Sequence, residues 1–141
     1  MTTIAYRNGI LAADSRCMLG GWKATYPLPK LFRLKDGSVC GICGDYASGL
    51  AFKDWLDSDH SNPRPTLPET TVIQMTSDGV TIHEDGASFP VVTEFAAWGS
   101  GSPAANGALH MGADAVKAVQ VAAMLDDSTG GDVTLMARLR T

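Results

Sequence analysis

Short apolar runs separated by turn residues fill the first part of the chain. Residues 2–7 and 10–14 are two such runs, and Asn8-Gly9 lies between them. Asparagine followed by glycine favours a two-residue type I′ turn, because both residues tolerate the positive φ that this turn requires. The pattern therefore predicts a β-hairpin at the N-terminus.

A second pair of apolar runs, residues 30–34 and 38–43, flanks Asp36-Gly37. By the same reasoning it predicts a second hairpin. Residues 15–29 connect the two hairpins and contain two glycines and two prolines. Because glycine and proline mark turns and loops, this stretch is predicted to be a loop.

Two segments have the three- and four-residue apolar spacing of an amphipathic helix. Residues 45–56 begin with Asp45, and residues 114–126 begin with Asp114. Aspartate is a favoured N-cap, because its carboxylate accepts hydrogen bonds from the first backbone N–H groups. Pro103 suits the first turn of a further helix, where its missing N–H costs nothing.

The rest of the chain alternates short β-like runs with turns. A polar, extended connection with three prolines is predicted at residues 58–69. Further strands are predicted at residues 70–76, 80–83, 87–92, 94–98 and 133–139. Because the strands cluster rather than alternate with helices, the pattern predicts an antiparallel-rich α+β fold.

Composition limits the class of protein. A chain of 141 residues predicts a single domain, residues 1–141. The net charge of −4 argues against a nucleic-acid partner, and no apolar run approaches the roughly 18 residues of a membrane span. Three cysteines without a paired framework indicate a reducing, cytoplasmic location.

Two short motifs could carry chemistry of other kinds. Residues 99–104 fit the G-x-G-x-x-A pattern of dinucleotide-binding turns. Such a site needs a second parallel strand ending in an acid, whereas the strand that follows the helices ends in Arg138 and Arg140. The hypothesis of a nucleotide-binding module is supported by residues 99–104 alone. Cys40 and Cys43 have no second ligand pair to complete a zinc site.

The N-terminus suggests nucleophilic chemistry. Thr2 follows Met1, and a small second residue permits aminopeptidase removal of the initiator. Thr2 would then carry a free α-amine with a reference pKa of about 7.7–8.0. Such an amine can act as general base to its own hydroxyl, which is the threonine variant of nucleophilic catalysis.

The rest of the chain supplies segments that match this chemistry. They are Thr2–Ile4, Ile10–Arg16, Lys30–Leu34, Val39–Asp45, Gly99–Pro103 and Asp126–Asp132. In this order they resemble the proteasome β-subunit family, which includes the bacterial peptidase HslV. The resemblance implies the fold of that family, a four-layer αββα sandwich of two antiparallel sheets (the N-terminal-nucleophile, or Ntn, hydrolase fold).

The resemblance also implies roles for individual residues. Thr2 matches the nucleophile, Lys30 the catalytic lysine, and Asp14 the acid that holds this lysine. Gly41 matches the glycine whose N–H forms the oxyanion hole, and Ser100 matches the serine near the terminal amine. Asp126, with Thr129 close by, matches the acid that supports the N-terminus and this serine.

Strand periodicity extends the resemblance to a substrate pocket. Val39 and Cys43 share a strand face with Gly41, so both are expected to line the pocket for the residue before the scissile bond. The chain departs from the family at residues 58–69, where the family continues into a second long helix. One outer-layer helix is therefore expected to be reduced or missing, which puts a closed ring and docking to an ATPase unfoldase in doubt.

The function predicted from these residues is a threonine-type peptidase that forms an acyl-enzyme on Thr2. This reaction requires no metal or cofactor. The expected partners are a peptide or unfolded-protein substrate and further copies of the chain, and an ATPase partner is left open. The alternatives are an amidase of the same fold that acts on small amides and a non-catalytic assembly or binding protein that retains the fold.

Overall fold

Eleven short strands and three short helices make up residues 2–139, the part of the chain that the computed structural model describes. The strands are β1 (Thr3–Arg7), β2 (Ile10–Ala13), β3 (Met18–Leu19), β4 (Trp22–Lys23), β5 (Leu31–Arg33), β6 (Val39–Cys43), β7 (Thr71–Thr76), β8 (Gly79–Glu84), β9 (Ala87–Val91), β10 (Phe95–Gly99) and β11 (Thr134–Ala137). The helices are α1 (Tyr46–Leu56), α2 (Ser102–His110) and α3 (Ala115–Leu125).

The local sequence signals predicted most of these elements. Both expected hairpins are present as β1–β2 and β5–β6, with Asn8 and Gly9 at positive φ in the first turn. The Asp45 side chain caps α1 by accepting from the Ser48 N–H, and Asp114 caps α3 in the same way. Residues 58–69 contain no helix or strand, as predicted.

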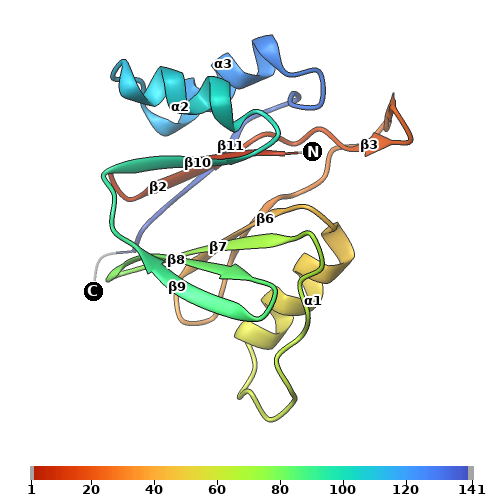
Figure 1. Ribbon diagram of the computed structural model, residues 1–141, viewed down its shortest axis with the longest axis vertical. Helices are drawn as coiled ribbons and strands as arrows, with labels where there is room; N and C mark the ends of the chain where they lie inside the picture. The colour runs from red at the N-terminus through yellow and green to blue at the C-terminus, as the bar shows by residue number, and fades with distance from the viewer. Residues whose placement is uncertain (1, 140–141) are drawn as a thin grey trace.

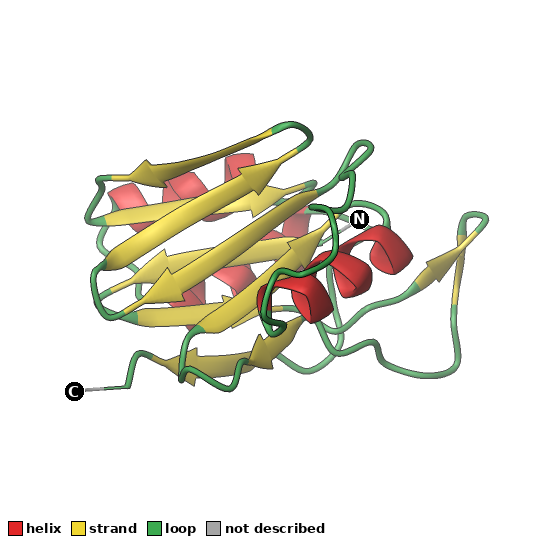
Figure 2. Cartoon of the chain, turned by 90° about the horizontal axis from the view of Figure 1, so that it is seen from below, coloured by secondary structure: helices red, strands yellow, loops and turns green. Residues whose placement is uncertain are grey.

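The strands form three antiparallel sheets. A four-stranded sheet has the order β10-β1-β2-β11, and a five-stranded sheet has the order β5-β6-β7-β8-β9. The third sheet is the ribbon β3-β4, which projects from the body of the molecule (Figures 1 and 2). Helices α2 and α3 cover one face of the four-stranded sheet, and α1 lies against the five-stranded sheet (Figure 1).

The expectation of a four-layer αββα sandwich of two antiparallel sheets was wrong. The described chain is mostly β, with three antiparallel sheets and only three short helices. One reason is that residues 15–29, predicted as a loop, form the additional ribbon β3-β4. Another is that α1 packs mainly against β6 and β7 of its sheet, while the Arg64 guanidinium in the connection donates to the backbone of β8 and β9.

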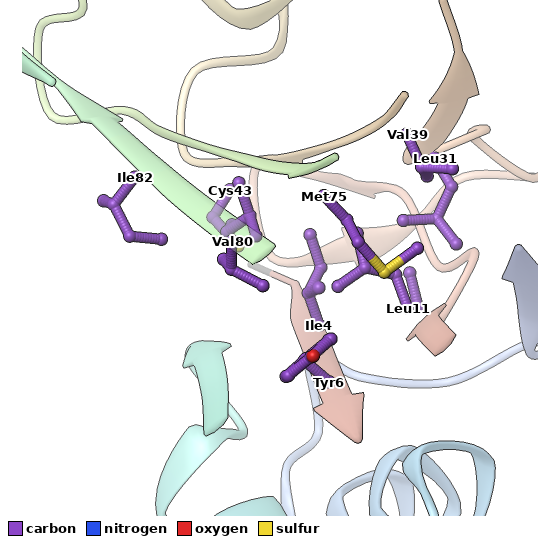
Figure 3. Packing of buried hydrophobic residues seen from close by; sticks show 11 residues of the cluster. Ile4, Tyr6, Leu11, Leu31, Val39, Cys43, Met75, Val80 and Ile82 are labelled. Carbon is purple, nitrogen blue, oxygen red and sulfur yellow. The ribbon is translucent and has the colours of Figure 1, made fainter. Parts of the chain in front are cut away.

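Two apolar clusters hold the four-stranded sheet in place. One lies between it and the five-stranded sheet, where Ile4, Leu11, Ile73 and Met75 are at most 1% exposed (Figure 3). The other lies under α2 and α3 and consists mainly of alanines, with Leu109 and Val119. Strand β1 is buried on both faces, so residues at its ends have fixed positions. No helix within residues 2–139 is long and apolar enough to cross a bilayer.

Candidate active site

Thr2 lies directly before β1, is 6% exposed, and borders two pockets. The first, called here the Ser100-side pocket, has a volume of about 300 Å³ and is also lined by Cys43, Gly44, Glu69, Thr71, Trp98, Gly99 and Ser100. The second, the Lys30-side pocket, has a volume of about 420 Å³ and includes Lys30, Ile42, Gly44 and Tyr46. Thr2 therefore separates two spaces that could hold the two sides of a substrate.

A buried ion pair lies at the Lys30-side pocket. The Lys30 Nζ is 2.9 Å from Asp14 Oδ1, and the two side chains are 3% and 0% exposed. Asp14 also accepts hydrogen bonds from the backbone N–H groups of Thr3 and Gly130, each at 3.0 Å. Three donors therefore satisfy and fix this carboxylate, which in turn fixes the ammonium.

A chain of hydroxyl groups lies on the other side of Thr2. The Thr129 hydroxyl donates to Asp126 Oδ2 at 2.6 Å, and the Ser100 hydroxyl donates to the same oxygen at 2.7 Å. The Thr3 and Thr129 hydroxyl oxygens are 2.8 Å apart. Because the Thr129 proton is directed at Asp126, the Thr3 hydroxyl must be the donor in this pair. The relay therefore runs from Thr3 through Thr129 to Asp126.

Hydrogen bonding keeps Asp126 ionised. The bond from the Thr129 hydroxyl is the largest reason that the pKa of Asp126 lies below its ordinary value, and the bond from Ser100 lowers it further. An ionised carboxylate that accepts hydrogen bonds from two hydroxyl groups can orient both hydroxyls but has no proton to donate. Ser100 is thereby placed in the lining of the pocket that it shares with Thr2.

The glycines of the G-x-G-x-x-A segment allow close contact between strands. Gly99 has φ +100°, and a Cβ there would collide with the Thr2 carbonyl oxygen. A Cβ at Gly101 would collide with the Thr3 hydroxyl. These contacts account for both glycines without a bound phosphate. They also explain why β10 can hold Ser100 beside Thr2.

Gly41 and Val39 lie away from the pockets, contrary to expectation. Gly41 is paired on both sides, with Leu31 of β5 and with Ile73 of β7, and its missing Cβ would lie 2.7 Å from Ile4 Cδ1 in the core. Val39 is fully buried in the same core. Neither residue lines either pocket beside Thr2.

Gly44, three residues further on, has the properties expected of Gly41. It follows the end of β6, lines both pockets, and its N–H has no hydrogen-bond partner within residues 2–139. The Ile42 N–H donates to the Lys30 carbonyl. Since alternate amides of a strand point the same way, the Gly44 N–H points past the end of β5, toward the Lys30-side pocket.

The backbone at Gly44 requires glycine. Its φ is +106°, and a Cβ would collide with the Glu69 carbonyl oxygen. Sequence reasoning missed this residue because the motif match favoured Gly41. The available signal was a glycine directly before the N-cap Asp45, where a strand must turn into a helix.

Cys43 lines the Ser100-side pocket, and its expected role beside the scissile bond stays a prediction. Burial raises the pKa of its thiol to about 12, so the thiol remains protonated at neutral pH. Cys43 therefore contributes an apolar wall and not a competing nucleophile. Within residues 2–139, no group of three His, Cys, Asp or Glu side chains converges on a possible metal position.

No family model matches the sequence, and no curated protein matches it. Two solved structures from Thiobacillus denitrificans are similar to it. BPH in complex with epoxomicin has a TM-score of 0.71 at 21% identity, over 96% of this chain and 97% of that chain. A second structure, of BPH, has a TM-score of 0.70 at 22% identity over the same shares. At this identity the likeness establishes a shared fold alone.

Proposed function

We propose that this protein is a threonine-type N-terminal-nucleophile peptidase related to the proteasome β-subunit and HslV family. The observation that carries the proposal is the buried Lys30–Asp14 ion pair in the pocket that Thr2 borders. A lysine ammonium is rarely taken out of water unless it is paired and needed there. A second support is that one structurally similar protein binds epoxomicin.

Removal of Met1, which lies outside the described residues, would leave Thr2 with a free amine. In the proposed reaction this amine accepts the proton of the Thr2 hydroxyl, and the oxygen attacks the substrate carbonyl. The Lys30 ammonium stabilises the negative charge that develops on the attacking oxygen. Because Asp14 holds Lys30 in place, this charge is already oriented before the reaction begins.

The tetrahedral intermediate places a negative charge on the former carbonyl oxygen. The Gly44 N–H, which has no hydrogen-bond partner within residues 2–139, is the donor we assign to this oxygen. Loss of one such donor typically raises the barrier by about 3–4 kcal/mol. Ser100, held by Asp126, lies on the opposite side of Thr2, where it can hydrogen-bond the amine that carries the proton to the leaving group.

Water then attacks the acyl-enzyme and regenerates Thr2, so the proposed cycle needs no cofactor. Both pockets are open clefts of a few hundred Å³, a size that suits side chains of a peptide or unfolded segment. We place this activity in the cytoplasm and in an oligomer of identical chains.

Intact mass and a pair of Thr2 variants test the proposal. We expect the purified, untagged protein to lack Met1 and to hydrolyse short fluorogenic peptides. Thr2→Ala should abolish hydrolysis, and Thr2→Ser should retain a part of it, because serine keeps the hydroxyl and the amine. Epoxomicin should raise the melting temperature of the wild type more than that of Thr2→Ala.

Two results would refute the proposal. Retention of Met1 in the active protein would block the amine and exclude the mechanism. Hydrolysis by Thr2→Ala at the wild-type rate would exclude Thr2 as the nucleophile.

A further inference from the structure

A second polar pocket lies at the opposite end of β1 from Thr2. Its volume is about 730 Å³, larger than either pocket beside Thr2. Its lining includes Tyr6, Arg7, the Asn8-Gly9 turn, Glu94 and Arg138. Thr3 and Arg7 are four residues apart on one strand, or about 13 Å at 3.3 Å per residue. The pocket is therefore separate from the candidate active site.

Arg138 has unused hydrogen-bonding capacity in this pocket. Its Nη2 donates to the Tyr6 hydroxyl oxygen at 3.0 Å. Its Nε is buried, and it is the one buried side-chain nitrogen or oxygen within residues 2–139 that lacks a hydrogen-bond partner. A buried donor without an acceptor is costly, so an acceptor that reaches this guanidinium would gain affinity. The Tyr6 hydroxyl accepts from Arg138, so its own proton is available to a ligand.

The pocket contains two arginines that form no ion pair within residues 2–139. Arg7 donates to the carbonyls of Leu109 and Ala113, at 3.0 and 2.5 Å, and its guanidinium lies over the Phe95 ring. Carbonyl oxygens hold this side chain in place but leave its full charge. Within the described part of the chain, neither Arg7 nor Arg138 has a carboxylate within 4 Å.

Glu94 limits the kind of anion that fits. It is exposed, lines the same pocket, and makes no ion pair with either arginine in the described residues. Its negative charge would repel a multiply charged group such as phosphate. Two guanidinium groups opposed by one carboxylate favour a ligand with a single negative charge.

We propose that this pocket is a binding site for a carboxylate, taken in by the Arg138 guanidinium fork and the Tyr6 hydroxyl. Guanidinium groups bind carboxylates with two parallel hydrogen bonds, and Arg138 has no carboxylate partner within residues 2–139. The carboxylate belongs to a small organic acid or to the carboxyl end of a short peptide. This site does not depend on peptidase activity at Thr2.

Titration of the full chain with matched probes tests the site. The probes are acetate, an N-acetylated tripeptide with a free carboxyl end, the same tripeptide as a carboxamide, and inorganic phosphate. Isothermal calorimetry gives the affinities, and amide NMR shifts at Gly9 and Arg138 locate the binding. We expect the tripeptide acid to bind at least about tenfold more tightly than its amide and than phosphate. A tenfold ratio of dissociation constants corresponds to a difference of about 1.4 kcal/mol in binding free energy. Acetate binding equal to that of the tripeptide acid would identify small acids as the ligand class.

Variants connect binding to the named groups. Arg138→Gln should weaken binding of the tripeptide acid by at least about tenfold, and Tyr6→Phe should weaken it by several-fold. Arg33→Gln is the matched control, because the Arg33 guanidinium lies beside β11, where it donates to the Ala137 carbonyl, but Arg33 is outside the pocket lining. Arg33→Gln should bind like the wild type.

Three results would overturn the proposal. One is equal affinity for the acid and the amide. Another is binding that Arg138→Gln and Tyr6→Phe both leave unchanged, with amide shifts away from Gly9. The third is no binding of any probe up to its solubility limit by a protein whose NMR spectrum shows it to be folded.

Discussion

The buried Lys30–Asp14 pair can be separated into a contribution to stability and a contribution to chemistry by a double-mutant cycle. The variants are Asp14→Asn, Lys30→Met and the double variant. Asparagine keeps an oxygen that can accept from the Thr3 N–H, and methionine keeps the length of the lysine side chain. Each single variant leaves one charge buried without its partner, whereas the double variant leaves none.

The magnitudes follow from the burial of the pair, at 3% and 0% exposure. Removal of one partner from a buried ion pair costs about 3–5 kcal/mol. Asp14→Asn should cost about 4 kcal/mol, because it also removes the bond from the Gly130 N–H. Lys30→Met, which leaves Asp14 with two backbone donors, should cost about 3 kcal/mol. The double variant should be about 2 kcal/mol less stable than the wild type, so the coupling energy is about 5 kcal/mol.

Urea unfolding followed by circular dichroism measures the stabilities, and peptide hydrolysis measures the chemistry. Hydrolysis should be lost in all three variants, including the double variant that recovers stability. Asp54→Asn is the matched control, because Asp54 pairs with Lys53 at 3.0 Å but is 74% exposed. This control should change stability by less than about 1 kcal/mol and leave hydrolysis intact. If the stability losses of the two single variants simply add in the double variant, Lys30 and Asp14 are not coupled as a buried ion pair. Hydrolysis by the double variant would refute the proposed role of Lys30.

Two further predictions concern pH and backbone packing. Burial lowers the pKa of His83 from 6.5 to about 4, so the unfolded state binds the extra proton between these values, and stability should fall by up to about 3 kcal/mol as pH decreases from 6.5 to 4. His83→Gln should lack this slope in urea titrations at several pH values, and an unchanged slope would assign it to other groups. Gly99→Ala should cost more than about 2 kcal/mol and abolish peptide hydrolysis, because the new Cβ collides with the Thr2 carbonyl oxygen. Gly107→Ala, in α2 with open space around it, should be neutral or stabilising when urea titrations compare the two variants. Equal effects of the two substitutions would contradict the close contact at Gly99.

Local signals predicted the elements but not their assembly. A turn pair such as Asn8-Gly9 and a helix cap such as Asp45 act within a few residues, so each could be recognised in isolation. The ribbon at Met18–Lys23 was missed because its strands have two residues each, too few for an alternating pattern. The number of sheets and the share of helix depend on which strands pair, and that information is not local.

The proposed oxyanion donor shows the same limit within the site. Matching of motifs selected Gly41, whereas our proposal selects Gly44, which lines both pockets beside Thr2. The difference depends on where the neighbouring strand β5 starts, because an amide of β6 is free only beyond that point. Lys30 lies just outside β5, and its carbonyl accepts from Ile42. The next amide on the same side is that of Gly44.

Sheet order explains why both polar sites exist where they do. In an antiparallel sheet of order β10-β1-β2-β11, the start of β1 lies beside the ends of β10 and β2 and the start of β11. Those strand ends are flanked by Thr2, Asp14, Ser100 and the Asp126–Thr129 loop, so residues far apart in the sequence meet at one end of the sheet. The opposite end joins the end of β1 to the start of β10 and the end of β11, which brings Arg7, Glu94 and Arg138 together. A ligand in the second pocket therefore contacts β1, the strand that follows Thr2. The effect of this ligand on the proposed hydrolysis at Thr2 can be measured directly.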